Sequence, residues 1–169
     1  MDFTEPAKPV EIRYFDRGPV DANMLILAGP WSAYWYNGFI YSSEIARGLD
    51  IFELASTKDL TRNEIEAAKA VRMPELNVQS QKRTVWPRNL IVAKAYVDQL
   101  ERSKALPSAR IAAIRRAIQN AETSGLNRKD AGKLKAFSPS LEKGAGVAKN
   151  PNDAARFRAL AEILRQPEL

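Results

Sequence analysis

The sequence predicts an α+β protein in which one antiparallel, four-stranded blade of the propeller type precedes a bundle of four or five short helices. Two observations carry this prediction. The stretch from Trp31 to Leu54 alternates apolar side chains with a period of two around Asn37-Gly38. After Leu54 the apolar spacing changes to three and four, which is typical of amphipathic helices. The chain of 169 residues therefore divides into a β-blade at 1–54 and an all-α region at 55–169.

The hairpin is the clearest element, because Asn-Gly between two alternating runs favours a type I′ turn with positive φ at both residues. A two-residue loop fixes the register and places Tyr34 opposite Tyr41. Alternation then puts Tyr34, Tyr36, Phe39 and Tyr41 on one face and Ala33, Trp35, Ile40 and Ser42 on the other. Both faces are apolar, so both need a cover. A sheet buried between other elements explains this more simply than an aromatic platform for a ligand.

The other strands are predicted on both sides of this hairpin. Val10–Phe15 alternates and is expected to form a strand after a proline-containing connector at Phe3–Pro9. Met24–Leu27 is a candidate short strand, and Leu49–Leu54 follows a turn at Ser43–Gly48 to close the unit. Four strands in up-and-down order describe one propeller blade.

Two segments, DFTEPAKPVEIRYFD and WSAYWYNGFIYSSEIARGLDIFEL, resemble the last repeat of bacterial LVIVD-repeat proteins. The residues that match are Asp2, Thr4, Pro6 and Pro9 in the connector and Gly48, Leu49, Ile51 and Phe52 in the strand. Asp50 and Glu53 depart from the apolar strand of that repeat, and only one repeat is present. The resemblance continues through Trp86-Pro87 to about Leu100. It implies the C-terminal part of a larger surface or secreted propeller, located outside the cell or at its surface, with no catalytic motif.

The helical region begins with a capping box, Thr61-Arg62-Asn63-Glu64, which predicts a helix to about Arg72. Pro87 is suited to the first position of a second helix, and Ser108 to the cap of a third that stops at Gly125. These two helices form an αα-hairpin at 87–123, with Leu100 and Ile114 expected in the core.

The pattern is weaker from Lys129 to Lys149. Ser138-Pro139 is expected to interrupt a helix there, and Lys143–Gly146 to be flexible. Asn150-Pro151 predicts the start of a last helix.

Cysteine and histidine are both absent, which removes disulfides, Cys/His zinc sites, thiol nucleophiles and histidine-based triads. Glu64 and Glu66 do not share a helix face, and Glu44 is better placed for an ion pair with Arg47 than for catalysis. The prediction is therefore no enzyme, no cofactor and no metal. No signal peptide or membrane span is encoded, because no apolar run has the required length.

The net charge of +6 lies in the C-terminal part, since residues 1–105 carry 14 Lys/Arg and 14 Asp/Glu and residues 106–169 carry 12 and 6. A cluster of cations raises the alternative of a basic helical module for nucleic acid or an anionic surface. Its members are Arg110, Arg115, Arg116, Arg128, Lys129, Lys133 and Lys135. Few aromatic side chains lie among them, and Arg110 and Arg115 fall opposite the isoleucine stripe. A solvated basic face is therefore favoured over a nucleic-acid site.

The sequence thus favours a non-catalytic module for protein–protein interaction. Helices after Leu54 can cover one face of the blade, and the other face then needs a second copy of the chain, another protein, or further blades. The expected interface residues are Tyr34, Trp35, Tyr36, Phe39, Ile40 and Tyr41.

Overall fold

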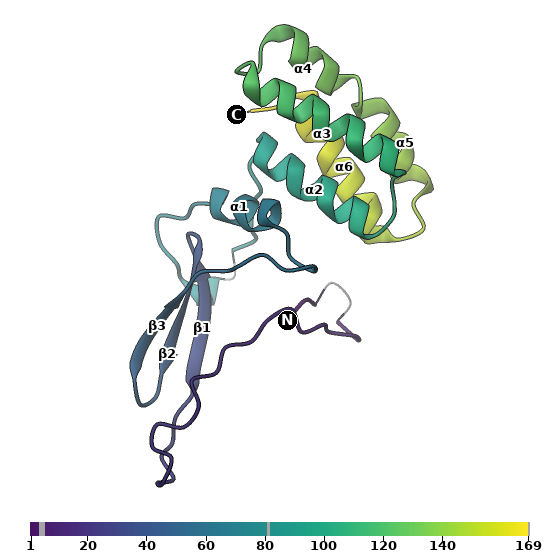
Figure 1. Cartoon of the computed structure of the whole chain (residues 1–169). Coiled ribbons are helices and arrows are strands. Elements are labelled where there is room, and N and C mark those ends of the chain that lie inside the picture. Colours follow the sequence, from purple (N-terminus) through teal and green to yellow (C-terminus); the bar gives the residue numbers. More distant parts are fainter. Residues whose placement is uncertain (4–5, 81, 169) are drawn as a thin grey trace.

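The computed structural model describes residues 1–3, 6–80 and 82–168 and has an α+β fold, with a three-stranded sheet set apart from a group of packed helices (Figure 1). Thr4 and Glu5, within the connector of the LVIVD resemblance, lie outside the described residues. The elements in chain order are β1 (Pro30–Tyr36), β2 (Phe39–Glu44), β3 (Gly48–Phe52), α1 (Arg62–Ala70), the short 3-10 helix η1 (Val78–Ser80), α2 (Leu90–Arg102), α3 (Ser108–Thr123), α4 (Arg128–Lys135), α5 (Ser138–Val147) and α6 (Pro151–Arg165).

The hairpin has the predicted geometry. Asn37 and Gly38 have φ values of 47° and 105°, and Tyr34 pairs with Tyr41 across the two strands. The third strand pairs antiparallel with β2, so the sheet order is β1-β2-β3. Trp31 has no partner on β2, because the register shifts between Pro30 and Ser32. This irregularity is of the kind made by a β-bulge.

The predicted fourth strand is not formed. Apart from an isolated bridge between Val10 and Asp2, the segment 10–15 has no strand structure, and neither does 24–27. The physical reason lies in side-chain contacts: the ring of Phe15 packs on the ring of Phe52 at a centroid distance of 4.7 Å. The N-terminal segment therefore crosses one face of the sheet instead of extending its edge. The described residues contain a three-stranded sheet and not the four-stranded blade.

The first helix begins where the capping box predicts. The Thr61 hydroxyl accepts a hydrogen bond from the Glu64 N–H, and the Glu64 carboxylate accepts one from the Thr61 N–H at 2.7 Å. The same carboxylate accepts two hydrogen bonds from Arg102 on α2, at 2.6 and 2.9 Å. These contacts join α1 to α2, so the first helix is part of the helical group.

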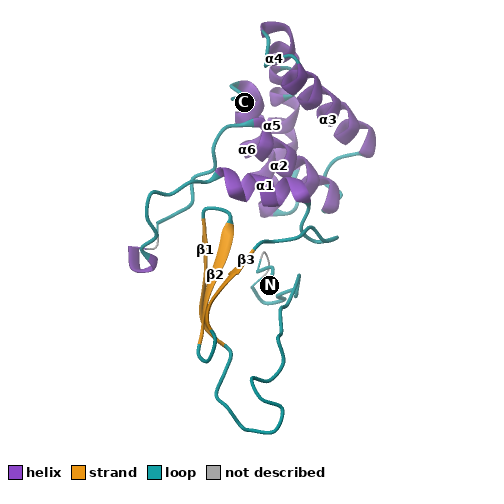
Figure 2. Ribbon diagram, turned by 60° about the vertical axis from the view of Figure 1, so that its left-hand side comes forward, coloured by secondary structure: helices purple, strands orange, loops and turns teal. Residues whose placement is uncertain are grey.

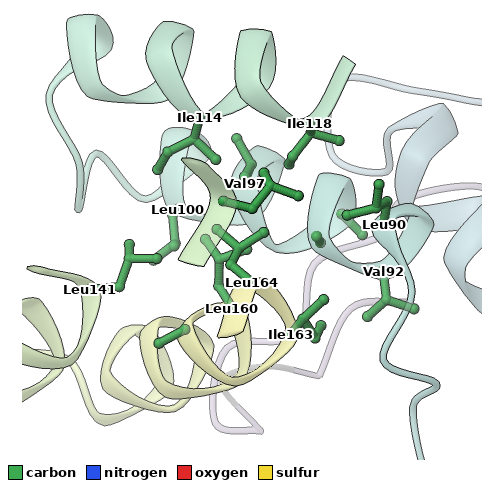
Figure 3. Packing of buried hydrophobic residues seen from close by; sticks show 14 of the residues in the cluster. Leu90, Val92, Val97, Leu100, Ile114, Ile118, Leu141, Leu160, Ile163 and Leu164 are labelled. Carbon is green, nitrogen blue, oxygen red and sulfur yellow. The ribbon is translucent and has the colours of Figure 1, made fainter. Parts of the chain in front are cut away.

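The main core lies between α2, α3 and α6, and its largest side chains are fully buried. Figure 3 shows Ile114 and Ile118 of α3 pointing at Val97 and Leu100 of α2, with Leu160 and Leu164 of α6 meeting them from the other side. Leu100 and Ile114 are each 0% exposed, as the αα-hairpin predicts. Pro87 lies outside the helix, however, because the Asn89 side chain caps α2 by accepting from the Val92 N–H.

The weak region forms two helices, and they are interrupted at residues 136–137, directly before Ser138-Pro139, as predicted. The predicted flexible segment at Lys143–Gly146 is wrong, because these residues lie within α5. Pro139 lies in the first turn of α5, where its missing N–H costs no hydrogen bond because the first N–H groups of a helix have no acceptor within the helix. Gly144 is inside that helix, and a Cβ built on it would lie 3.2 Å from Cε1 of Phe157 on α6. Close packing of α5 on α6 thus uses a glycine that local propensity would place in a loop.

Candidate functional site

One face of the sheet is covered by no helix or strand in the part of the chain that the structure describes. The pairing places six apolar side chains on it, which we call the open face: Tyr34, Tyr36, Phe39, Tyr41, Leu49 and Ile51. Tyr34 is 42% exposed, Phe39 40%, and Ile51 57%. Tyr36 and Tyr41 are half-buried, with ring centroids 6.2 Å apart. The open face is therefore a continuous apolar surface in contact with solvent.

The N-terminal segment runs beside the sheet (Figure 2) and partly covers the opposite face. Besides the contact of Phe15 with Phe52, Arg17 forms an ion pair with Asp50. Trp35 and Ile40, the two remaining residues of the predicted interface, lie on this covered face and are half-buried. The structure thus separates the six predicted interface residues into four on the open face and two on the covered one.

Leu49 and Ile51 were not among the predicted interface residues. Both are on β3, where Ile51 pairs with Tyr41 and Leu49 pairs with Ser43. Residues that pair directly share a face, so the pairing of the third strand would have revealed them. The sequence did not fix that register, because the connection between β2 and β3 is longer and less characteristic than Asn-Gly.

Among the described residues, the helical region contacts the sheet mainly at the tip of the hairpin, and Tyr36 is the member of the open face that it reaches. The Asn37 side chain accepts from the Met73 N–H at 2.8 Å and donates to the Met73 carbonyl at 2.9 Å. Arg72 donates to the Asn37 carbonyl, and the Tyr36 hydroxyl donates to the Pro74 carbonyl at 3.1 Å. The expectation that helices cover one face of the sheet is therefore wrong. They hold the sheet by one end and leave its open face accessible.

Glu44 has a structural role that differs from the predicted ion pair with Arg47. Its carboxylate accepts hydrogen bonds from the backbone N–H groups of Gly29, Ala46 and Arg47. The bond from Gly29 is the main reason that the pKa of Glu44 lies below its ordinary value of 4.5. The Arg47 side chain instead donates to the Pro19 carbonyl at 3.0 Å, which helps to hold the N-terminal segment.

Three members of the predicted basic cluster have partners among the described residues. Arg115 reaches α2 and pairs with Asp98 and Glu101, at 2.6 Å in each case. Lys133 pairs with Asp130 at 2.8 Å, and Arg110 lies over the ring of Phe137, 5.2 Å from its centroid. Arg115 is therefore not simply a solvated charge: it stabilises the packing of α3 on α2.

Residues 1–3, 6–80 and 82–168 contain no group of three or more acidic side chains placed to hold a metal ion. Within the same residues, no helix combines the length and the apolar character needed to cross a membrane.

Comparisons with protein-family models, with curated proteins and with solved structures gave no match for this chain. The resemblance to LVIVD-repeat proteins accordingly rests on the residues quoted for it.

Proposed function

We propose that this chain is a non-catalytic protein–protein interaction module that binds a partner through the open face of its sheet. The observation that carries the proposal is the exposure of that face. A buried aromatic side chain covers about 150–250 Å², at about 25 cal/mol per Å². Tyr34 and Phe39, each about two-fifths exposed, thus leave roughly 1.5–2.5 kcal/mol per ring to be gained from a partner.

The partner that this surface favours is a second copy of the chain. An apolar face is complementary to itself, and a two-fold arrangement places the same patch on both sides of the interface. Packing of one sheet on another is also how neighbouring propeller blades bury their faces. In this proposal the sheet is an incomplete blade, the C-terminal part of a larger propeller at the cell surface. The resemblance of the connector and of Gly48–Phe52 to LVIVD repeats supports it.

Sedimentation velocity at micromolar concentrations tests the proposal. We expect a dimer whose population rises with concentration. Ile51→Lys places a charge on the open face, on the edge strand beside Tyr41, and should shift the chain to monomer. Leu25→Lys is the matched control, because Leu25 is fully exposed on the loop before β1 and outside the open face. A monomer at every concentration, or equal loss of dimer in both variants, would overturn self-association through this face.

A further inference from the structure

A groove lies between α3 and α4, on the side of α3 that faces away from the core. Its volume is about 730 Å³, and its floor consists of alanines: Ala109, Ala112, Ala113 and Ala117 on α3 and Ala136 at the end of α4. The core side of α3 is formed by isoleucines, of which Ile111, Ile114 and Ile118 are buried. The helix therefore has a second apolar face, made of small side chains, that no described element covers.

The rim of the groove is positively charged. Arg110, Arg116 and Lys133 line it, and no acidic side chain does. The two acids between residues 107 and 137 are already engaged, Glu122 with Lys94 of α2 and Asp130 with Lys133. This stretch has seven Lys/Arg against two Asp/Glu, a net charge of +5 out of +6 for the chain. Arg116 has no ion-pair partner among the described residues.

We propose that the groove is a docking site for an acidic amphipathic helix of another protein. Alanine side chains let a helix approach closely, and the leucine-sized side chains of that helix would fill the space between α3 and α4. Glutamates or aspartates beside those side chains would meet Arg110 and Arg116, so charge complementarity would set the orientation. Phe137, half-buried beneath Arg110, closes one end of the groove with an aromatic ring.

A helical peptide fits the groove better than a nucleic acid does. Five alanines form an apolar floor, and phosphates gain nothing from such a surface. Two of the seven cations of the basic cluster, Arg115 and Lys133, are already paired with carboxylates. The only aromatic ring in the groove lies under a guanidinium, where no base can stack on that side.

This surface is separate from the open face of the sheet. In Figure 1 α4 and the outer side of α3 lie at the end of the molecule opposite β1, β2 and β3. The proposed docking of an acidic helix is therefore independent of self-association, and the chain would connect two binding partners.

The test measures binding of a fluorescent, helix-forming synthetic peptide to the full chain. The peptide carries leucines at i, i+3 and i+7 flanked by glutamates, and a second peptide replaces these glutamates by lysines. We expect binding of the acidic peptide only, with NMR amide shifts confined to α3, α4 and the start of α5. Ala113→Arg fills the groove and should weaken binding at least about tenfold. Its matched control is Ala155→Arg, at an exposed position of α6.

The charge is tested with Arg116→Glu, which should also weaken binding at least about tenfold. Arg158→Glu, at an exposed position on α6, makes the same change of net charge outside the groove. The proposal is overturned if the acidic peptide causes no shifts in α3 and α4, or if each variant and its control behave alike. It is also overturned if a DNA duplex, and not the peptide, produces those shifts.

Discussion

Gly38 permits two things at the tip of the hairpin: a turn with φ of 105° and a close approach to α1. A Cβ at this position would lie 3.2 Å from Cγ of Lys69 on α1. The Lys69 amine forms an ion pair with Glu53, which directly follows β3. Backbone conformation and packing thus both select glycine. The same residue sets the register of the sheet and the distance between the sheet and the first helix.

Gly38→Val should therefore destabilise the chain by more than about 1 kcal/mol, because a β-branched side chain is strained at positive φ. Chemical denaturation followed by tryptophan fluorescence measures this loss, since Trp35 lies in the hairpin. Gly146→Val provides the control: that glycine is exposed in α5 and has nothing within 4 Å of a built Cβ. Equal stability of the Gly38 variant and the wild type would show that the turn is not constrained as described.

Glu64 is a buried acid with a shifted pKa. Burial would raise the pKa of its carboxyl, but hydrogen bonds from Arg102 and from the Thr61 N–H outweigh burial and hold it below 4.5. Because the folded pKa is depressed, the stabilisation is fully present above pH 4.5 and is lost as the pH falls through the folded value. Acid should thus loosen α1 from α2.

Glu64→Gln should lower the stability at pH 7 by roughly 1–3 kcal/mol, the range for a charged hydrogen bond that is lost. The variant should also show a smaller further loss than the wild type between pH 5 and pH 3, measured by urea denaturation at each pH. Glu75→Gln, on the exposed loop after α1, controls for the removal of one negative charge. An unchanged pH dependence in Glu64→Gln would contradict the assignment.

At the scale of the element, α3 presents three different surfaces in three successive residues. Ile114 is buried in the core, Arg115 reaches Asp98 on α2, and Arg116 lines the groove. Asp98 is 7% exposed at its side chain and also accepts hydrogen bonds from Thr61 and Asn63 of α1. The Asp98 carboxylate of α2 thus binds side chains of α3 and of the start of α1.

Alanine substitutions along α3 should separate these surfaces by their effect on the free energy of unfolding. Ile114→Ala should lower it by about 2–5 kcal/mol as a core truncation. Arg115→Ala should lower it by about 1 kcal/mol, because Asp98 loses its cation but keeps two neutral donors. Arg116→Ala, next in sequence and without an ion pair, should change it by less than about 0.5 kcal/mol. An Arg115 effect as small as that of Arg116 would show that the Asp98 pair contributes nothing.

The two glycines of α5 form another matched pair. Ala improves helix propensity over Gly by about 1 kcal/mol, so Gly146→Ala should stabilise the chain by up to that amount. Gly144→Ala should gain less or be destabilising, since its Cβ would meet Phe157 at 3.2 Å. Thermal unfolding followed by circular dichroism compares the two variants. A larger gain at Gly144 than at Gly146 would contradict the close packing of α5 on α6.

At the scale of the whole molecule, short sequence motifs predicted the turns and helix starts that depend only on neighbouring residues. Asn37-Gly38 predicted the turn and register of the hairpin, and Thr61 with Glu64 predicted the start of α1. The sequence did not predict that the segment around Phe15 passes over one face of the sheet, because this depends on the contact of Phe15 with Phe52, which is distant in the sequence. Nor did it predict the partners of Arg115 or the open face as a whole, which depend on packing between elements.

The molecule thus has a closed helical core and a sheet that is held mainly at its tip and covered on one face by an N-terminal segment. Opening the sheet exposes little apolar surface that is not already exposed, whereas opening α2 or α6 exposes the core. We expect amide hydrogen exchange in β1 to β3 to be at least about tenfold faster than in α2 and α6 at low protein concentration. Raising the concentration should slow exchange in the sheet alone, if a second copy covers the open face. Equal protection in the sheet and the helices of a monomer would contradict this division of stability.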